Sequence, residues 1–133
     1  MTILVVAAVM VDQGRVLTTQ RPAGSHLAGM WEFPGGKVEP DEDPRDALAR
    51  ELNEELGIRA DIRDVVEVTF HRYPNKNILL FFFRAFLRTD SLPPRAVGVA
   101  DIAWRTEHQL DDALFPPADV AVLEHVRALL RSS

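Results

Sequence analysis

Three glutamates, Glu51, Glu54 and Glu55, lie close together in a segment whose pattern predicts a helix. At 100° per residue they share one arc of that helix, about 100° wide. Glutamates on a helix most often form a solvated surface, but these are unfavourably placed. Glu51 and Glu55 are a like-charge i,i+4 pair, and the dipole at the C-terminal half disfavours each carboxylate by ~0.3–1 kcal/mol. Arg50 is the single nearby cation, so the cluster indicates a bound metal ion.

A hard divalent cation would turn this repulsion into affinity. Mg²⁺ takes oxygen ligands and is usually held by a few carboxylates, with substrate phosphates and water completing its shell. Gly35 and Gly36 precede the helix and carry no side chain, so their main-chain groups can approach a metal or a phosphate closely. Together these residues predict metal-assisted chemistry on a phosphate-containing ligand.

The helix that carries the glutamates is expected over residues 44–56. Asp43 is a suitable N-cap and Pro44 suits the first turn. Gly57 stands where a left-handed C-terminal cap belongs. A second arc of the helix is apolar and is expected to face the core; it consists of Leu48, Ala49, Leu52 and Leu56.

The rest of the chain predicts a mixed sheet flanked by helices, which is an α+β fold. Strands are expected at residues 3–11, 15–20, 61–73, 77–89 and 99–104, a loop from Arg21 to Gly36, a turn or short helix at 107–112, and a final helix at 117–131. The turn Asp12-Gln13-Gly14 is expected to close the first hairpin. The apolar run Ile78–Phe83 should be buried on both faces of the sheet.

Length and composition limit the possible functions. The 133 residues suit one domain over residues 1–133, and 47% hydrophobic and 26% charged residues are typical of a globular protein. A net charge of −5 argues against sequence-independent binding to DNA or RNA. The absence of cysteine removes disulfides, thiolate metal sites and cysteine nucleophiles. The apolar start is interrupted by Asp12, too early for a membrane span, and a cytoplasmic location is expected.

The spacing that begins before the helix matches a known signature. It runs Gly36, five residues, Glu42, seven residues, then Arg50-Glu51-Leu52-Asn53-Glu54-Glu55-Leu56-Gly57-Ile58. This pattern resembles the Nudix box, G-x5-E-x7-R-E-U-x-E-E-x-G-U with U aliphatic, at every fixed position. The resemblance implies a Nudix hydrolase, an α/β/α sandwich with a central mixed sheet and a loop-helix-loop, which hydrolyses nucleoside diphosphates linked to another moiety.

The same resemblance assigns roles to the residues of the motif. Glu51, Glu54, Glu55 and the carbonyl of Gly35 would be ligands of Mg²⁺ or Mn²⁺. Arg50 would orient the glutamates. Glu42 would support the loop and helix or the metal shell, and either Glu51 or Glu55 would accept the proton of the attacking water.

Further segments resemble the MutT-like branch of the family; they are Arg21-Pro22-Ala23, Trp31–Glu39, Trp104 and Phe115–Asp119. Enzymes of this type convert a nucleoside triphosphate, such as 8-oxo-dGTP, CTP or 5-methyl-dCTP, to monophosphate and pyrophosphate. By this resemblance Arg21 would contact the triphosphate, Phe33 would lie against the base, and Lys76 would replace a family arginine near the base. Asp119 stands where MutT itself has asparagine, and an ionised aspartate only accepts hydrogen bonds.

One position departs from the MutT-like pattern. Gly98 occurs six residues before Trp104, where relatives carry a glutamate that serves as a metal ligand or base. Asp101 or Glu107 would substitute for it, or the helix glutamates would act alone. Two alternatives therefore stay open, a Nudix hydrolase of ADP-ribose or another nucleoside diphosphate derivative, and a nucleotide-sensing module with weakened catalysis. The expected partner is a small nucleotide, and the expected state is a monomer or weak homodimer.

Overall fold

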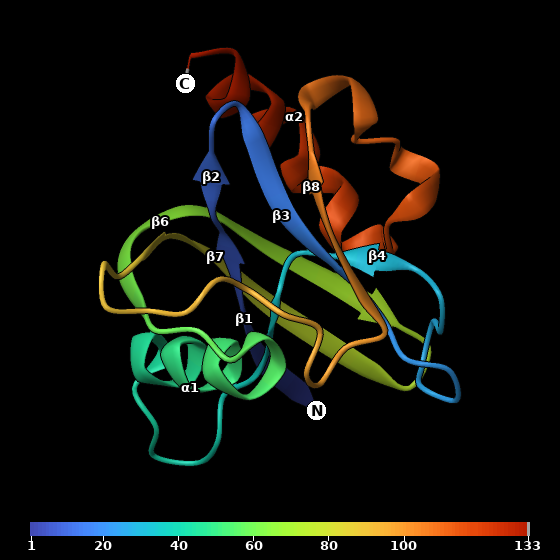
Figure 1. Ribbon diagram of the computed structural model, residues 1–133. Coiled ribbons are helices and arrows are strands. Elements are labelled where there is room, and N and C mark those ends of the chain that lie inside the picture. The colour runs from blue at the N-terminus through green and yellow to red at the C-terminus, as the bar shows by residue number, and fades with distance from the viewer. Residues whose placement is uncertain (133) are drawn as a thin grey trace.

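The computed structural model describes residues 1–132, and its central element is a four-stranded sheet (Figure 1). Its strands, in spatial order, are β5 (Gly35–Lys37), β1 (Thr2–Val9), β7 (Lys76–Leu87) and β6 (Ala60–Tyr73). β1 pairs with β7 in parallel, whereas β1 with β5 and β6 with β7 are antiparallel. The predicted mixed sheet is confirmed.

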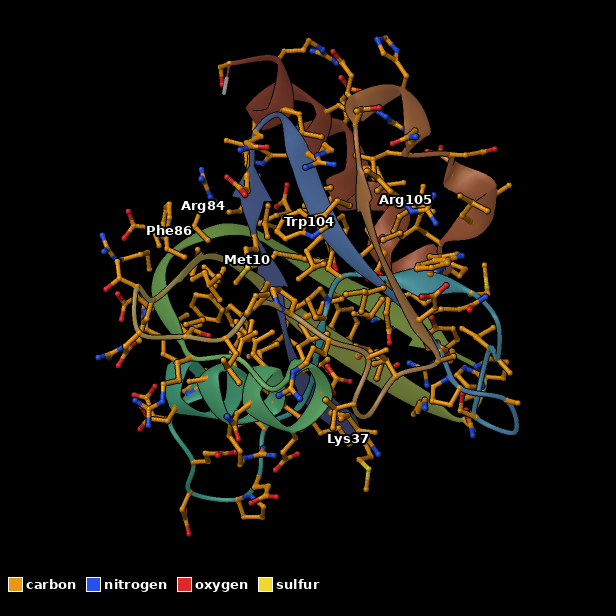
Figure 2. The ribbon with its side chains drawn as sticks, viewed as in Figure 1. Met10, Lys37, Arg84, Phe86, Trp104 and Arg105 are labelled. Atoms are coloured by element: carbon orange, nitrogen blue, oxygen red, sulfur yellow. The ribbon has the colours of Figure 1, made fainter. Side chains whose placement is uncertain are left out.

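A second, antiparallel sheet covers one end of the first. It consists of β2 (Val11–Asp12), β3 (Arg15–Gln20), β4 (Trp31–Glu32) and β8 (Asp101–Arg105), with β3 paired to the other three. The tight turn between β2 and β3 has Gln13 at φ 52° and Gly14 at φ 74°, the left-handed conformation that a two-residue hairpin turn needs. Figure 2 shows Trp104 and Arg105 on β8. Trp104 is half-buried and packs against the α1 side of the core, and the Arg105 guanidinium lies 4.4 Å from the Trp31 ring centroid.

Two helices lie on opposite faces of the central sheet. α1 (Pro44–Leu56) begins at Asp43, whose carboxylate accepts a 2.8 Å hydrogen bond from Arg45 N. It ends at Gly57, which has φ 65° and donates to Asn53 O over 2.9 Å, as predicted. α2 (Pro117–Arg131) follows two short 3-10 helices, Glu107–Gln109 and Asp112–Leu114. No helix among residues 1–132 combines the length and the apolar character needed to cross a membrane.

The alternation of side chains along the strands explains the three layers. On β7, Ile78, Leu80 and Phe82 pack with the α2 side of the core. Phe83 packs with the α1 side, and half-buried Phe81 joins it there. Apolar side chains on both faces need a cover on each face. The α/β/α sandwich and the two-sided burial of this run are thus confirmed.

The structure corrects several expected boundaries. The expected loop from Arg21 to Gly36 contains β4 and the first residues of β5. These strands have two and three residues, too few to show an alternating pattern, and β5 pairs with β1 through glycines. The expected strand 3–11 is interrupted at Met10. The short helix expected at 107–112 is present as the 3-10 helix Glu107–Gln109, and a second 3-10 helix begins at Asp112. In α1, Ala47 is fully buried and Ala49 is only half-buried.

Candidate active site

A cavity of about 440 Å³ opens between α1, β5, β1 and the N-terminal end of α2. One end is walled by α1 and the glycines of β5, and the other by β4, the β6–β7 turn and α2. Charged side chains from six segments line it: Arg21, Glu32, Lys37, Glu51, Glu55, Lys76 and Asp119. A concave site with few convergent polar groups is the usual form of a small-molecule site.

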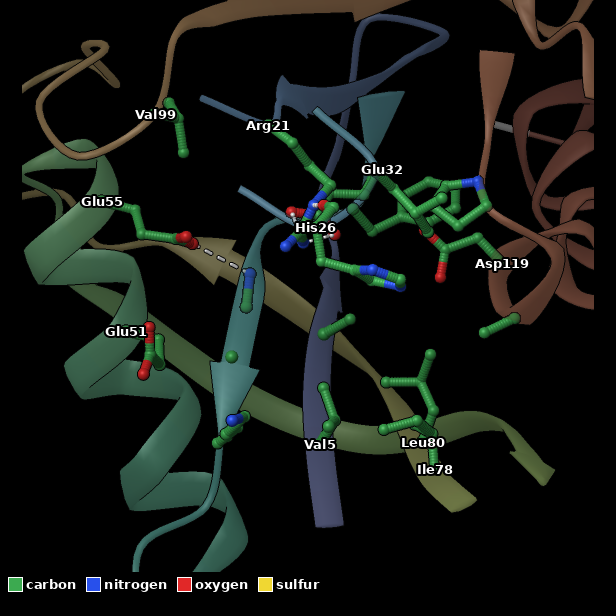
Figure 3. Close-up of a pocket in the computed structure, with 18 of the residues that line it drawn as sticks. Val5, Arg21, His26, Glu32, Glu51, Glu55, Ile78, Leu80, Val99 and Asp119 are labelled. Atoms are coloured by element: carbon green, nitrogen blue, oxygen red, sulfur yellow. Dashed lines mark hydrogen bonds and ion pairs between the residues drawn. The ribbon is translucent and has the colours of Figure 1, made fainter. Parts of the chain in front are cut away.

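The acidic arc of α1 faces this cavity with two of its three glutamates. Glu51 and Glu55 are one turn apart and both line the cavity (Figure 3). Glu54 lies at the edge of the arc, and its side chain is 57% exposed beside Arg50. The predicted arc is therefore present, but in this arrangement Glu54 does not line the cavity.

Arg50 holds the acidic residues around it in a network. Its Nε and Nη2 donate to the two oxygens of Glu42 over 2.8 and 2.9 Å. Its Nη1 reaches Glu51 over 3.1 Å and Glu54 over 3.3 Å. Nη2 also donates to Lys37 O over 3.2 Å, which ties the loop before α1 to the helix. Hydrogen bonding to Arg50 lowers the pKa of Glu42 to about 2, so Glu42 stays ionised.

Glu55 is fixed by β5. Its Oε1 accepts a 3.0 Å hydrogen bond from Gly35 N, drawn as the dashed line in Figure 3. Burial, followed by the nearby Glu32 and Glu51 charges, raises the pKa of Glu55 to about 8. Burial also raises the pKa of Glu51. A cation bound beside these two carboxyl groups would lower their pKa values and stabilise the ionised forms.

The donors around Gly35 and Gly36 fit a hard divalent cation. A side chain at Gly35 would collide with the Val6 carbonyl, and one at Gly36 with the Glu51 carboxylate, so only glycine allows this approach. Carboxylate and carbonyl oxygens are the ligands that Mg²⁺ prefers. Within residues 1–132 no three acidic or histidine side chains converge on one point. Glu54 accepts a 3.3 Å hydrogen bond from Arg50.

The rest of the cavity holds a second set of charges, which extends from Glu32, close enough to raise the pKa of Glu55, to Asp119 on α2. Arg21 Nη1 contacts both carboxylate oxygens of Glu32, over 3.0 and 3.1 Å. Asp119 is only 5% exposed. Burial and then the Glu32 charge raise its pKa well above the usual range, against a hydrogen bond from the Phe33 backbone. Lys76 lines the same part of the cavity, so the structure brings the predicted Arg21, Lys76 and Asp119 together.

Phe33 lines the cavity from within the core. Its residue is 2% exposed, and its ring stacks on Phe115 at 5.6 Å and meets the edge of Phe82 at 6.0 Å. The ring thus belongs to the core that supports the cavity wall. Because Phe33 also lines the cavity, its expected place against a base stays a prediction.

Sequence reasoning gave no role to Glu32 and Tyr73, which also line the cavity. The signals that mark Glu32 are its place between Trp31 and Phe33 and its position in the MutT-like segment Trp31–Glu39. Tyr73 lies 5.7 Å from the ring of His26 and 4.5 Å from that of His71. Burial and the Asp119 charge raise its pKa.

Neither expected substitute for the missing glutamate reaches the site. Glu107 accepts a 2.7 Å hydrogen bond from Arg131 Nε near the end of α2. Asp101 is exposed and accepts from its neighbour Ile102 N over 2.8 Å. The acidic residue that joins Glu51 and Glu55 in the cavity wall is Glu32 on β4 instead. Gly98 contacts the last turn of α1.

Known proteins share both the pattern and the architecture. The NUDIX domain family model matches residues 1–127. The CTP pyrophosphohydrolase of Escherichia coli K12 is 60% identical over 62 residues, 47% of this chain and 46% of that protein, so the match spans less than half of its length. The 8-oxo-dGTP diphosphatase of Haemophilus influenzae is 38% identical over 113 residues, 85% of this chain and 82% of that protein. The solution structure of the E. coli ORF135 protein superposes with a TM-score of 0.81 and 38% identity, covering 98% of this chain and 92% of that one.

Proposed function

The chain belongs to the Nudix family, and from this premise we propose that it is a divalent-metal-dependent nucleoside triphosphate pyrophosphohydrolase. It would convert a modified or ordinary triphosphate of the 8-oxo-dGTP or CTP type to monophosphate and pyrophosphate. One observation carries the proposal: Glu51 and Glu55 face Gly35 and Gly36 at one end of a cavity that has Asp119 at the other. We place this activity in the cytoplasm as one domain, with free nucleotides as substrates.

The acidic end is suited to hold the phosphates. Mg²⁺ or Mn²⁺ held by Glu51, Glu54, Glu55 and the Gly35 carbonyl would neutralise phosphate charge and lower the pKa of a bound water. Arg50 keeps Glu51 and Glu54 beside this point through its 3.1 and 3.3 Å contacts. The Glu54 side chain is exposed, so it could rotate from Arg50 toward the cavity when phosphates are bound.

The glutamates of α1 are the proton acceptors of this site. Glu51 or Glu55 accepts the proton of the attacking water, since both line the cavity. The pKa of Glu55 is raised to about 8 in the metal-free protein, and a bound cation would lower it and so favour the ionised form that accepts a proton. Gly35 N keeps the Glu55 carboxyl directed toward β5 through its 3.0 Å hydrogen bond.

The other end is suited to a nucleobase. Asp119 presents a buried carboxyl, and its raised pKa supports a protonated form that both donates and accepts a hydrogen bond. A neighbouring donor and acceptor on a base edge complement such a group. Both cytosine and an 8-oxopurine present that pair, so we propose the class of substrate and leave the choice to a substrate panel.

The test is product analysis with a panel of 8-oxo-dGTP, dGTP, CTP, 5-methyl-dCTP and ADP-ribose in Mg²⁺. We expect monophosphate and pyrophosphate from at least one triphosphate, and loss of turnover in Glu54→Gln. Glu124→Gln, an exposed glutamate on α2 with 73% of its side chain accessible, is the matched control and should retain turnover. Cleavage of ADP-ribose alone would replace the triphosphate proposal, and nucleotide binding without turnover would replace it with a sensing role.

A further inference from the structure

The segment 93–99, called the strap here, lies against the C-terminal end of α1. In Figure 1 it is part of the yellow-orange chain that passes beside that helix end. Arg95 N donates to Leu56 O, and Val97 N and Gly98 N both donate to Glu55 O, each over 3.0 Å. Just beyond the strap, Ala100 N donates to Gln20 O of β3, also over 3.0 Å. The strap thus connects the acidic helix with the second sheet.

The end of α1 has a particular need for these contacts. The last carbonyls of any helix lack partners within the helix, and here the same turn carries Glu54 and Glu55. No basic residue lies in the last turn of α1 to offset this negative end. Arg95 supplies that charge from the strap, because its guanidinium lies directly over Gly57, the C-cap.

We propose that the strap is a positioning element of the active site, which holds the backbone of Glu55 while β5 holds its carboxylate. Glu55 is then fixed at both ends, by Val97 N and Gly98 N on its carbonyl and by Gly35 N on its side chain. Val99, the last residue of the strap, lines the cavity and lies near Glu55 in Figure 3. The inference deepens the proposed function and rests on it.

Gly98 is the residue that allows this contact. A Cβ atom at position 98 would lie 3.2 Å from Glu54 O and 3.3 Å from Glu55 Cα, closer than ordinary van der Waals contact. Any side chain there must move the strap or the end of α1 by a few tenths of an ångström. The glycine that departs from the MutT-like pattern therefore has a positive role, namely close approach to the turn that carries Glu54 and Glu55.

The test compares Val97→Pro with Val97→Ala. Val97 is 58% exposed, so neither change disturbs the core, but proline removes the N–H that donates to Glu55 O. Mn²⁺ binding to the free protein, measured by electron paramagnetic resonance, and kcat and KM with a triphosphate are the readouts. We expect Val97→Pro to weaken Mn²⁺ binding and to lower kcat by about tenfold with a smaller change in KM. Val97→Ala should stay within about twofold of the wild type.

Gly98→Ala provides a second, milder perturbation, and it should shift Mn²⁺ affinity and kcat in the same direction. Circular dichroism checks that each variant is folded. Folded variants with wild-type Mn²⁺ affinity and kcat would overturn the inference, and so would a wild type that binds no Mn²⁺. If Mn²⁺ binding weakens as expected but the wild type cleaves no triphosphate, the strap keeps its positioning role and the proposed reaction fails.

Discussion

Replacing Glu55 by glutamine should stabilise the metal-free protein at alkaline pH. Burial and the charges of Glu32 and Glu51 raise the pKa of Glu55 from 4.5 to about 8. Glutamine has nearly the same shape and can still accept the hydrogen bond from Gly35 N, but it carries no charge to bury. The substitution therefore removes an unfavourable ionisation without removing the contact to β5.

The sign and size follow from proton binding. The folded protein keeps the Glu55 proton up to about pH 8, whereas the unfolded chain loses it near pH 4.5. Between these values the folded state binds more protons, so the free energy of unfolding falls as the pH rises. Each pKa unit corresponds to about 1.4 kcal/mol, which sets a ceiling near 5 kcal/mol above pH 8. Because Glu32 and Glu51 share the interaction, we expect Glu55→Gln to gain about 2–4 kcal/mol at pH 9.

Urea denaturation in EDTA at pH 5 and pH 9 measures this difference. The gain of Glu55→Gln should be small at pH 5 and large at pH 9. Glu124→Gln is the control with the opposite electrostatics, because hydrogen bonding to Arg131 lowers the pKa of Glu124. It should bring no gain at pH 9. A Glu55→Gln protein that is no more stable than the wild type at pH 9 would refute the claim that burial and nearby negative charges raise the pKa of Glu55.

Four further outcomes follow from the same structure. Asp119→Asn should keep kcat/KM within about threefold near neutral pH, because an amide donates and accepts as a protonated carboxyl does, whereas Asp119→Ala should lose about tenfold or more in steady-state kinetics. Arg50→Lys should weaken Mn²⁺ binding, measured by calorimetry, since the single ammonium group of lysine cannot bind Glu42, Glu51 and Glu54 at once as the guanidinium does. Phe33→Ala should lower the free energy of unfolding in urea by about 3–5 kcal/mol, as expected for a core ring. Gly98→Glu should lower kcat with a triphosphate rather than raise it, because the new Cβ crowds the end of α1.

The helix and its caps were predictable because each depends on local chemistry. Asp43 and Gly57 fix the ends of α1 through hydrogen bonds to residues within four positions, so their types suffice to locate them. The placement of Arg50 among the glutamates follows equally from its position in the motif. Layer order was accessible too, since an apolar run such as Ile78–Phe83 needs a cover on both sides.

The remaining features depend on contacts between distant segments. β4 and β5 exist because β3 and β1 offer hydrogen-bonding partners, which no pattern within residues 31–37 reveals. The burial of Phe33 depends on Phe82 and Phe115, and the pairing of Glu32 with Arg21 depends on the fold of the loop between them. Gly98 was read as a missing ligand, whereas its close packing on the end of α1 appears only in three dimensions.

The central claim is that the acidic face of α1 and the glycines of β5 form a metal-dependent site for breaking a nucleoside triphosphate. The most direct test is the identity of the products when the purified protein is incubated with 8-oxo-dGTP or CTP and Mg²⁺, beside Glu54→Gln and an EDTA control. The account predicts equal amounts of monophosphate and pyrophosphate from the wild type, with neither product in the two controls. Release of orthophosphate and a diphosphate, or turnover that persists in Glu54→Gln, would contradict it.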